Sequence, residues 1–178
     1  MIRWTVVRRF ASVAFAAALT ACSEPTAPAP SAAARPLAFD LAKSSLIQCP
    51  SDISQTASAL LGVLGGEVSV GDTRVIIPPD ALPLFGLSLV TLNVPPSKYV
   101  EIEVRVNGLP HFQFAQPVTV VIDYRRCTRS DIDRDPLRVW HIDPLTKTFL
   151  EDMGGVDDKV ARTVTFSTDH FSGYAIAQ

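Results

Sequence analysis

Three alternate carboxylates in the segment Asp131-Ile-Asp-Arg-Asp135 are candidate cation ligands. Calcium prefers clustered carboxylate oxygens, but a loop of the EF-hand type also needs glycine at its sixth position and glutamate at its twelfth. Those positions hold Pro136 and Ile142. A solvated loop, in which Asp131, Asp133 and Asp135 face nearby arginines, explains the charges more simply, and calcium binding is the alternative. The arginines are Arg125, Arg126, Arg129, Arg134 and Arg138.

The histidines show no zinc-ligand spacing. His111, His141 and His170 stand 30 and 29 positions apart, whereas zinc sites that sequence can reveal use Cys-x-x-Cys or His-x-x-x-His spacing. The sequence also lacks the Gly-x-Ser-x-Gly elbow of serine hydrolases and a phosphate-binding glycine loop. We therefore expect no metal, no cofactor and no enzyme of a familiar hydrolase or nucleotide-using type.

Cys22 is a candidate for covalent lipidation. The first nine residues are basic, and an uncharged apolar run from Phe10 to Ala21 follows. This pattern is typical of a secretory signal peptide, and the run is shorter than the roughly 20 residues of a membrane-spanning helix. The run ends in Leu19-Thr20-Ala21-Cys22, which resembles the bacterial lipobox, whose cysteine is diacylated. An ordinary signal peptide with an incidental Cys22 is the alternative.

The lipobox resemblance implies a protein anchored in the bacterial cell envelope. Two or more acyl chains bind a protein stably to a membrane, whereas a single chain binds it only reversibly. Ser23 follows the cysteine; in similar lipoproteins an aspartate there retains the protein in the inner membrane, so we expect the outer membrane if the organism is Gram-negative. We predict a signal peptide over 1–21, a lipidated cysteine with a flexible Pro/Ala-rich linker over 22–48, and a folded domain over 49–178.

Removal of the signal peptide changes the charge balance. The 178 residues include 16 Lys and Arg against 18 Asp and Glu, a net charge of −2. Residues 1–21 contain three arginines and no acid, so 13 basic and 18 acidic residues remain, a net charge of −5. An acidic surface does not attract phosphate backbones, and we expect no nucleic-acid partner. The length is sufficient for one domain with its own core.

The two other cysteines, Cys49 and Cys127, are expected to pair. Once Cys22 is lipidated, these two thiols are the ones left in the chain. An exported protein folds in an oxidising compartment, which favours a disulfide. Two free thiols are the alternative.

The folded part has the pattern of an all-β antiparallel sandwich. Short β-branched runs alternate with turn residues from about Ser58 onward, and no window keeps apolar residues at helical spacing for three turns. The expected strands are Ala59–Val63, Glu67–Val70, Arg74–Ile77, Ser88–Val94, Val100–Val106, Val118–Tyr124, Leu137–Ile142, Val160–Phe166 and Ser172–Ala177. Asn107-Gly108 is the clearest tight-turn signal.

Hydrophobic patterning predicts which strands are central. Alternation in 100–106 indicates one buried face and one solvated face, with Glu101, Glu103 and Arg105 on the solvated side. The nearly continuous apolar run 118–122 is typical of a strand covered on both faces. We expect Trp140, Phe149 and Phe166 to be core aromatics.

The segment Leu64-Gly-Gly-Glu-Val-Ser-Val70, followed by Val75-Ile-Ile-Pro-Pro-Asp-Ala-Leu82, resembles the opening of ZU-five domains, the β-sandwiches of ankyrins, zonula occludens proteins and netrin receptors. The resemblance covers about residues 60–178. Asp80 stands where the family often has glycine. Proline has no amide hydrogen to donate to a neighbouring strand, so Pro78-Pro79 must end the expected strand Arg74–Ile77. Ala81 and Leu82 can then pack under the turn that follows.

The same resemblance suggests a reaction at Asp169-His170-Phe171-Ser172. Related modules in inflammasome and death-domain proteins cut themselves between Phe and Ser of a His-Phe-Ser sequence. In this chain Ser172 would attack the carbonyl of Phe171, with His170 as base and backbone strain raising the ground state. The alternative is an ordinary last strand, since bacterial relatives carry similar His-Phe-Ser-x-Tyr-Ala runs.

Together these patterns favour a lipid-anchored cell-envelope protein that presents a non-catalytic sandwich as a structural or protein-interaction module. We expect its partners to be the membrane, through the anchor, and an envelope protein or a glycan. Self-cleavage between Phe171 and Ser172 and service as a glycan- or peptide-binding accessory domain are the alternatives. An exposed apolar patch would favour binding, whereas His170 in contact with Ser172 beside a strained bond would favour cleavage.

Overall fold

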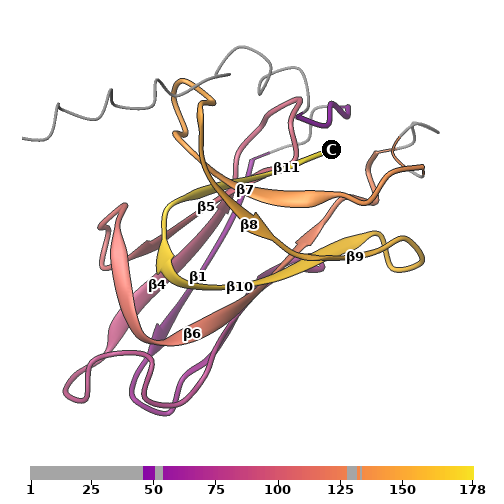
Figure 1. Ribbon diagram of the computed structural model, residues 1–178. Coiled ribbons are helices and arrows are strands. Elements are labelled where there is room, and N and C mark those ends of the chain that lie inside the picture. Colours follow the sequence, from indigo (N-terminus) through magenta and orange to yellow (C-terminus); the bar gives the residue numbers. More distant parts are fainter. Residues whose placement is uncertain (1–45, 51–53, 128–131, 133) are drawn as a thin grey trace, which may run out of the picture. The chain divides into compact units, whose positions relative to one another are not determined.

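The computed structural model describes residues 46–50, 54–127, 132 and 134–178. The predicted lipidation site Cys22, the signal peptide, the linker residues 23–36, Arg129 and the acidic residues Asp131 and Asp133 lie outside these ranges. The described residues form eleven strands and no helix (Figure 1). None of them therefore belongs to a helix long and apolar enough to cross a membrane.

The strands form two antiparallel sheets that pack face to face, which confirms the predicted all-β sandwich. The six-stranded sheet has the order β1 (Gln55–Leu61), β4 (Ser88–Val94), β5 (Glu101–Val106), β11 (Gly173–Ala177), β7 (Arg138–Ile142) and β8 (Phe149–Gly154). The five-stranded sheet has the order β2 (Gly66–Val70), β3 (Thr73–Ile77), β6 (Phe112–Asp123), β10 (Thr163–Phe171) and β9 (Val156–Asp158).

The core is built from alternate side chains of the central strands. Val118, Val120 and Ile122 of β6 are fully buried and Val121 is 5% exposed, as the continuous apolar run predicted for a strand covered on both faces. Phe149 and Phe166 are buried as expected. Trp140 is half-buried and stacks on Phe149 on the other face of its sheet, with ring centroids 4.8 Å apart.

The turn between β1 and β2 requires glycine at position 65. Gly65 has φ of 71°, and a Cβ added there would lie 2.1 Å from the carbonyl oxygen of Ile77. Pro78 and Pro79 end β3 at Ile77, as predicted. Ala81 and Leu82 are then buried under the turn. The backbone of the Gly-Gly turn therefore packs directly against the backbone of the Ile-Pro-Pro segment, which leaves no room for a side chain at position 65.

Several strand predictions needed revision, among them the first, because β1 runs over Gln55–Leu61 and not Ala59–Val63. β8 and β9 were not expected, and the residues predicted to open a strand at Val160 form a turn instead, in which the Asp158 carboxylate accepts from the amides of Val160 and Ala161. β6 begins at Phe112, six residues before the predicted start. Its pairing with β10 continues beyond a register shift and includes Gln113 and Phe112. Proline is tolerated at such an irregularity because it has no ladder hydrogen to lose there.

The expectation that Glu101 faces solvent was wrong. Its side chain is 4% exposed and pairs with Lys147, with Oε2 and Nζ 2.5 Å apart. Lys147 lies in the turn between β7 and β8, so a residue distant in the sequence supplies the compensating charge. Glu103 and Arg105 do lie at the surface, where they pair with each other at 2.6 Å.

Cys49 and Cys127 are joined in the structure, with Cα atoms 4.8 Å apart and a sequence separation of 78. The geometry is consistent with the predicted disulfide. The segment before Cys49 also belongs to the folded part, because Leu46 and Ile47 are buried and Leu46 pairs with Ala177 of the last strand.

Candidate functional site

The strongest cluster of polar and titratable side chains lies where the chain passes from β10 in one sheet to β11 in the other. β10 ends at Phe171 and β11 begins at Gly173, so Ser172 occupies the corner between them. Figure 1 shows the chain bending at this point from one layer of the sandwich to the other. Ser172 is 3% exposed. We call this region the β10–β11 corner: His111, His141, Glu151, Thr168, Asp169, His170, Ser172 and Tyr174.

Strand register places three of these residues side by side. Tyr174 of β11 pairs with His141 of β7, and His141 pairs with Glu151 of β8. Directly paired residues project their side chains from the same face of a sheet. His170 approaches from the end of β10 in the other sheet, and its ring centroid lies 5.2 Å from that of His141. The two sheets thus each contribute a histidine to the corner.

The Ser172 hydroxyl is hydrogen-bonded to His141. Its Oγ lies 2.8 Å from Nε2 of the ring. The proposed self-cleavage named His170 as the base, but the ring that contacts the hydroxyl belongs to His141. Positions 170 and 172 also do not share a strand face, because Ser172 follows the end of β10. Phe171 and Ser172 are not among the described residues with positive φ, so the bond between them shows no left-handed strain.

His170 is held by its own strand. Nδ1 lies 3.1 Å from Oδ1 of Asp169 and 3.4 Å from the Thr168 hydroxyl. The carbonyl of His170 accepts hydrogen bonds from Thr168, at 2.9 Å, and from the hydroxyl of Tyr174. These bonds fix both the backbone and the ring of His170 at the end of β10.

Burial and like charge act together on the corner's ionisable groups. Burial is the main cause that lowers the pKa of His141 below 6.5, and the nearby His170 lowers it further. Hydrogen bonds from His170 and Gln113 lower the pKa of Asp169. Burial raises the pKa of Tyr174 to about 12. Burial thus favours the uncharged forms of His141 and Tyr174, whereas hydrogen bonds favour the charged carboxylate of Asp169.

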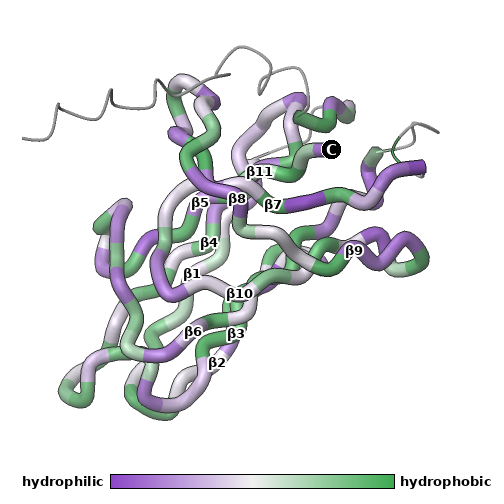
Figure 2. The backbone as a smooth tube through the Cα atoms, viewed as in Figure 1, coloured by the Kyte–Doolittle hydropathy of each residue, from purple (hydrophilic) through white to green (hydrophobic). Residues whose placement is uncertain are grey.

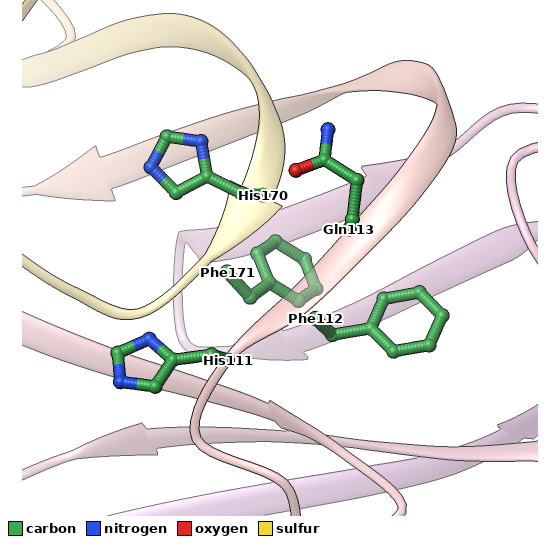
Figure 3. A pocket seen from close by; sticks show the side chains of 5 residues that line it. All are labelled: His111, Phe112, Gln113, His170 and Phe171. Atoms are coloured by element: carbon green, nitrogen blue, oxygen red, sulfur yellow. The ribbon is translucent and has the colours of Figure 1, made fainter.

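A hollow of about 450 Å³ opens beside the corner (Figure 3). His170 and Phe171 line it from the end of β10, and His111, Phe112 and Gln113 line it from the start of β6. Figure 3 shows the His170 and Gln113 side chains projecting on the same side of the two strands. All three histidines of the chain thus lie in or beside this region, because His111 also acts electrostatically on His141.

At the described residues of the acidic loop, the contacts that the structure shows involve Lys159. The Lys159 ammonium donates to the carbonyl oxygens of Ile132 and Asp135, at 2.5 and 2.7 Å, and pairs with the Asp157 carboxylate at 2.7 Å. Arg126 donates to the carbonyl oxygens of Pro50, Ser97 and Tyr99. The ammonium group of Lys159 therefore supplies a positive charge at the described end of this loop.

A second surface feature is an exposed apolar patch, here called the loop patch. It consists of Leu60, Leu64, Leu84, Phe85, Leu87 and Leu89, of which Phe85 is 92% exposed and Leu64 84% exposed. Leu60 and Leu89 are paired across β1 and β4, and a Cβ at Gly62 would contact the side chain of Leu87 at 3.3 Å. Figure 2 shows hydrophobic stretches in the loops at the lower end of the view.

Sequence reasoning missed both the pairing of His141 with Ser172 and the proximity of the three histidines. The three histidines come from β7, from β10 and from the residue before β6, and no local spacing rule connects these segments. One usable signal was present: the run from Thr168 to Tyr174 contains several polar side chains within a segment otherwise rich in buried residues. Buried polar groups require partners, so such a run indicates a hydrogen-bonded network.

Comparison with known protein families and with curated proteins finds no match to this chain. The resemblances to lipoproteins and to ZU-five domains therefore stay predictions that rest on the quoted residues. The class that the structure itself defines is a two-sheet antiparallel β-sandwich.

Proposed function

We propose that this protein is a lipid-anchored component of the bacterial cell envelope that uses its sandwich, ZU-five-like in its sequence motifs, as a protein-interaction module. The single observation that carries the binding role is the loop patch. Six large apolar side chains on β1, β4 and the adjoining turns are exposed, and exposed apolar clusters on soluble domains are typical of interaction sites.

The position of the patch residues supports binding over a purely structural role. Phe85 and Leu84 lie in the loop before β4 and do not contribute to the buried core. Fold stability therefore does not require large apolar residues at these positions. An envelope protein with a complementary apolar surface is the occupant that fits best, since aromatic and aliphatic anchors dominate protein interfaces.

Site-specific crosslinking in the native membrane tests the interaction. A photoreactive residue at position 85 should give a discrete crosslinked species, whereas the same residue at Val160, which is 98% exposed but outside the patch, should give none. The variant Leu87→Glu should abolish the crosslink from position 85. Equal crosslinking from both positions would contradict the proposal.

The anchor is tested separately at Cys22. Cells grown with a labelled fatty acid should incorporate label into the wild-type protein and not into Cys22→Ser, and the variant should leave the membrane fraction. A protein recovered from the cytosol with residues 1–21 still attached and no lipid would contradict both the anchor and the envelope location.

Self-cleavage is a second candidate function, favoured by one observation: the 2.8 Å contact between Ser172 Oγ and His141 Nε2. A histidine that removes the hydroxyl proton would activate Ser172 toward the preceding carbonyl. Cleavage would release residues 172–178. Intact mass of the purified protein decides the question, because the full-length mature mass in wild type and in His141→Ala alike excludes the reaction.

A further inference from the structure

We propose that the β10–β11 corner binds a divalent transition-metal ion, with His141, His170 and Glu151 as its protein ligands and zinc as the representative ion. This inference is independent of the loop patch and of the lipid anchor. It also departs from the sequence expectation of no metal, which rested only on the absence of local ligand spacing.

Three potential ligand atoms converge at the corner. One ring nitrogen each of His141 and His170 and a carboxylate oxygen of Glu151 all lie within 4.8 Å of one another. Zinc binds histidine nitrogen at about 2.0–2.1 Å and carboxylate oxygen at about 2.0–2.2 Å, so tetrahedral ligands stand about 3.4 Å apart. Binding thus requires the three groups to close by at most about 1.4 Å. The Glu151 side chain is exposed, and rotation of this long side chain can supply much of that movement.

The ligand set suits the metal. Two imidazoles and one carboxylate, with the fourth position left to water, form the combination found in open zinc sites. Imidazole also accepts copper and nickel, whereas calcium and magnesium prefer oxygen ligands only. The corner offers two nitrogens, so a transition metal fits and a hard cation does not.

Hydrogen bonds already orient both histidines. Metal-binding histidines characteristically use the other ring nitrogen to bond a carboxylate or another oxygen, which fixes the ring and the tautomer. His170 does this through Nδ1 and the carboxylate of Asp169, 3.1 Å away. His141 does it through Nε2 and the hydroxyl of Ser172 at 2.8 Å. The ion is therefore assigned to the other nitrogen of each ring, Nδ1 of His141 and Nε2 of His170.

Strand pairing places the ligands on a rigid frame. His141 and Glu151 are cross-strand neighbours on β7 and β8, while His170 lies one residue before the end of β10 in the opposite sheet. An ion held by all three would join the two sheets at the corner. Metal binding should therefore stabilise the folded protein, because the unfolded chain does not bring the ligands together.

Titration of the full-length protein in detergent tests the site. The protein should carry a purification tag without histidine, be stripped with a chelator, and be titrated with zinc chloride by calorimetry. We expect one equivalent to bind, with micromolar affinity or tighter. Bound Co²⁺ should show the intense visible absorption of a tetrahedral site. Less than half an equivalent of zinc with weak octahedral cobalt spectra would overturn the proposal.

Variants separate the site from adventitious binding. His141→Ala, His170→Ala and Glu151→Gln should each weaken zinc binding at least 10-fold, and zinc should raise the Tm of the wild type but not of these variants. Glu67→Gln is the matched control, because Glu67 is an exposed glutamate on β2 of the other sheet. Glu151 is also exposed, so Glu151→Gln should fold normally even if a histidine variant does not. Unchanged zinc affinity in Glu151→Gln would overturn the ligand set.

Discussion

The β10–β11 corner and the loop patch are both surface features, yet they are built in opposite ways. The corner gathers polar groups from four strands, several of them buried or half-buried, and holds them with hydrogen bonds such as those between Thr168, His170 and Tyr174. The patch gathers exposed apolar groups on neighbouring turns and strand ends. The corner is therefore pre-organised for a small ligand, whereas the patch is available to a large apolar partner.

This difference has an energetic consequence. The hydrogen bonds within the corner form only in the folded state, where they replace bonds to water, so each adds a net stability of about 0.5–1.5 kcal/mol. Side chains in the loop patch make few core contacts, so substitutions there should leave the fold intact. Stability measurements can thus separate the two regions before either ligand is known.

The largest expected effect belongs to the disulfide, which lies in neither region. The double variant Cys49→Ser with Cys127→Ser should lose up to roughly 4.5 kcal/mol of unfolding free energy, because the bond closes a segment with a separation of 78 positions. Denaturant unfolding measures the loss. If corner and patch belong to one cooperative domain, amide exchange should accelerate in both together. Identical unfolding of the wild type with and without reductant would contradict the pairing.

Two phenylalanines, one between the corner residues His170 and Ser172 and one in the loop patch, compare the surroundings of the two regions. Phe171 is fully buried against Phe114, with ring centroids 4.4 Å apart, whereas Phe85 is 92% exposed. Phe171→Ala should lower the unfolding free energy by about 3–5 kcal/mol, and Phe85→Ala should change it by less than about 0.5 kcal/mol. Chemical denaturation of both variants measures the difference. Similar losses in the two variants would show that the patch belongs to the core.

Alkaline pH should affect the corner and spare the patch. The pKa of Tyr174 is about 12 in the folded protein and about 10 for an unfolded tyrosine. The unfolded state therefore releases the proton first, and stability that is complete below pH 10 should fall by roughly 2–3 kcal/mol as the pH rises through 12. Tyrosinate absorbance and unfolding curves measure this, and Tyr174→Phe should flatten the decline. A Tyr174 that titrates near pH 10 would contradict it.

The smallest expected effect concerns single hydroxyls. Ser172→Ala removes a buried hydroxyl bonded to His141 and should cost about 1 kcal/mol of unfolding free energy. The matched control Ser58→Ala removes an exposed hydroxyl that contacts Thr91 at 2.9 Å and should cost close to nothing. Equal effects in denaturant unfolding would indicate that the corner is not a coupled network.

The fold followed from local patterns where those patterns were strong. β4 matches the predicted Ser88–Val94 in both ends, and Asn107 and Gly108 have the positive φ values of 53° and 77° that the tight turn requires. β8 and β9 were missed because their residues are largely exposed and lack apolar alternation. Their pairing partners, β7 and β10, provide the hydrogen bonds that hold them as strands.

The candidate site was harder to predict for a related reason. His170 and Ser172 were singled out from one short motif, but the partner of Ser172 proved to be His141, 31 positions away. That contact depends on the order of strands in the sheets, which places β7 beside β11. Strand order is decided by how the two sheets pack, and no local signal in β7 specifies it.

The sequence by itself determined that the domain is all-β, where several strands and turns begin, and which thiols were available to pair. These features depend on alternation of side chains, on proline and glycine backbone limits and on residue counts, all of which are local or compositional. Only the tertiary structure decided that His141, Glu151 and His170 meet and that Glu101 is buried against Lys147. Such contacts are made between strands far apart in the chain, and their geometry exists only once both sheets have packed.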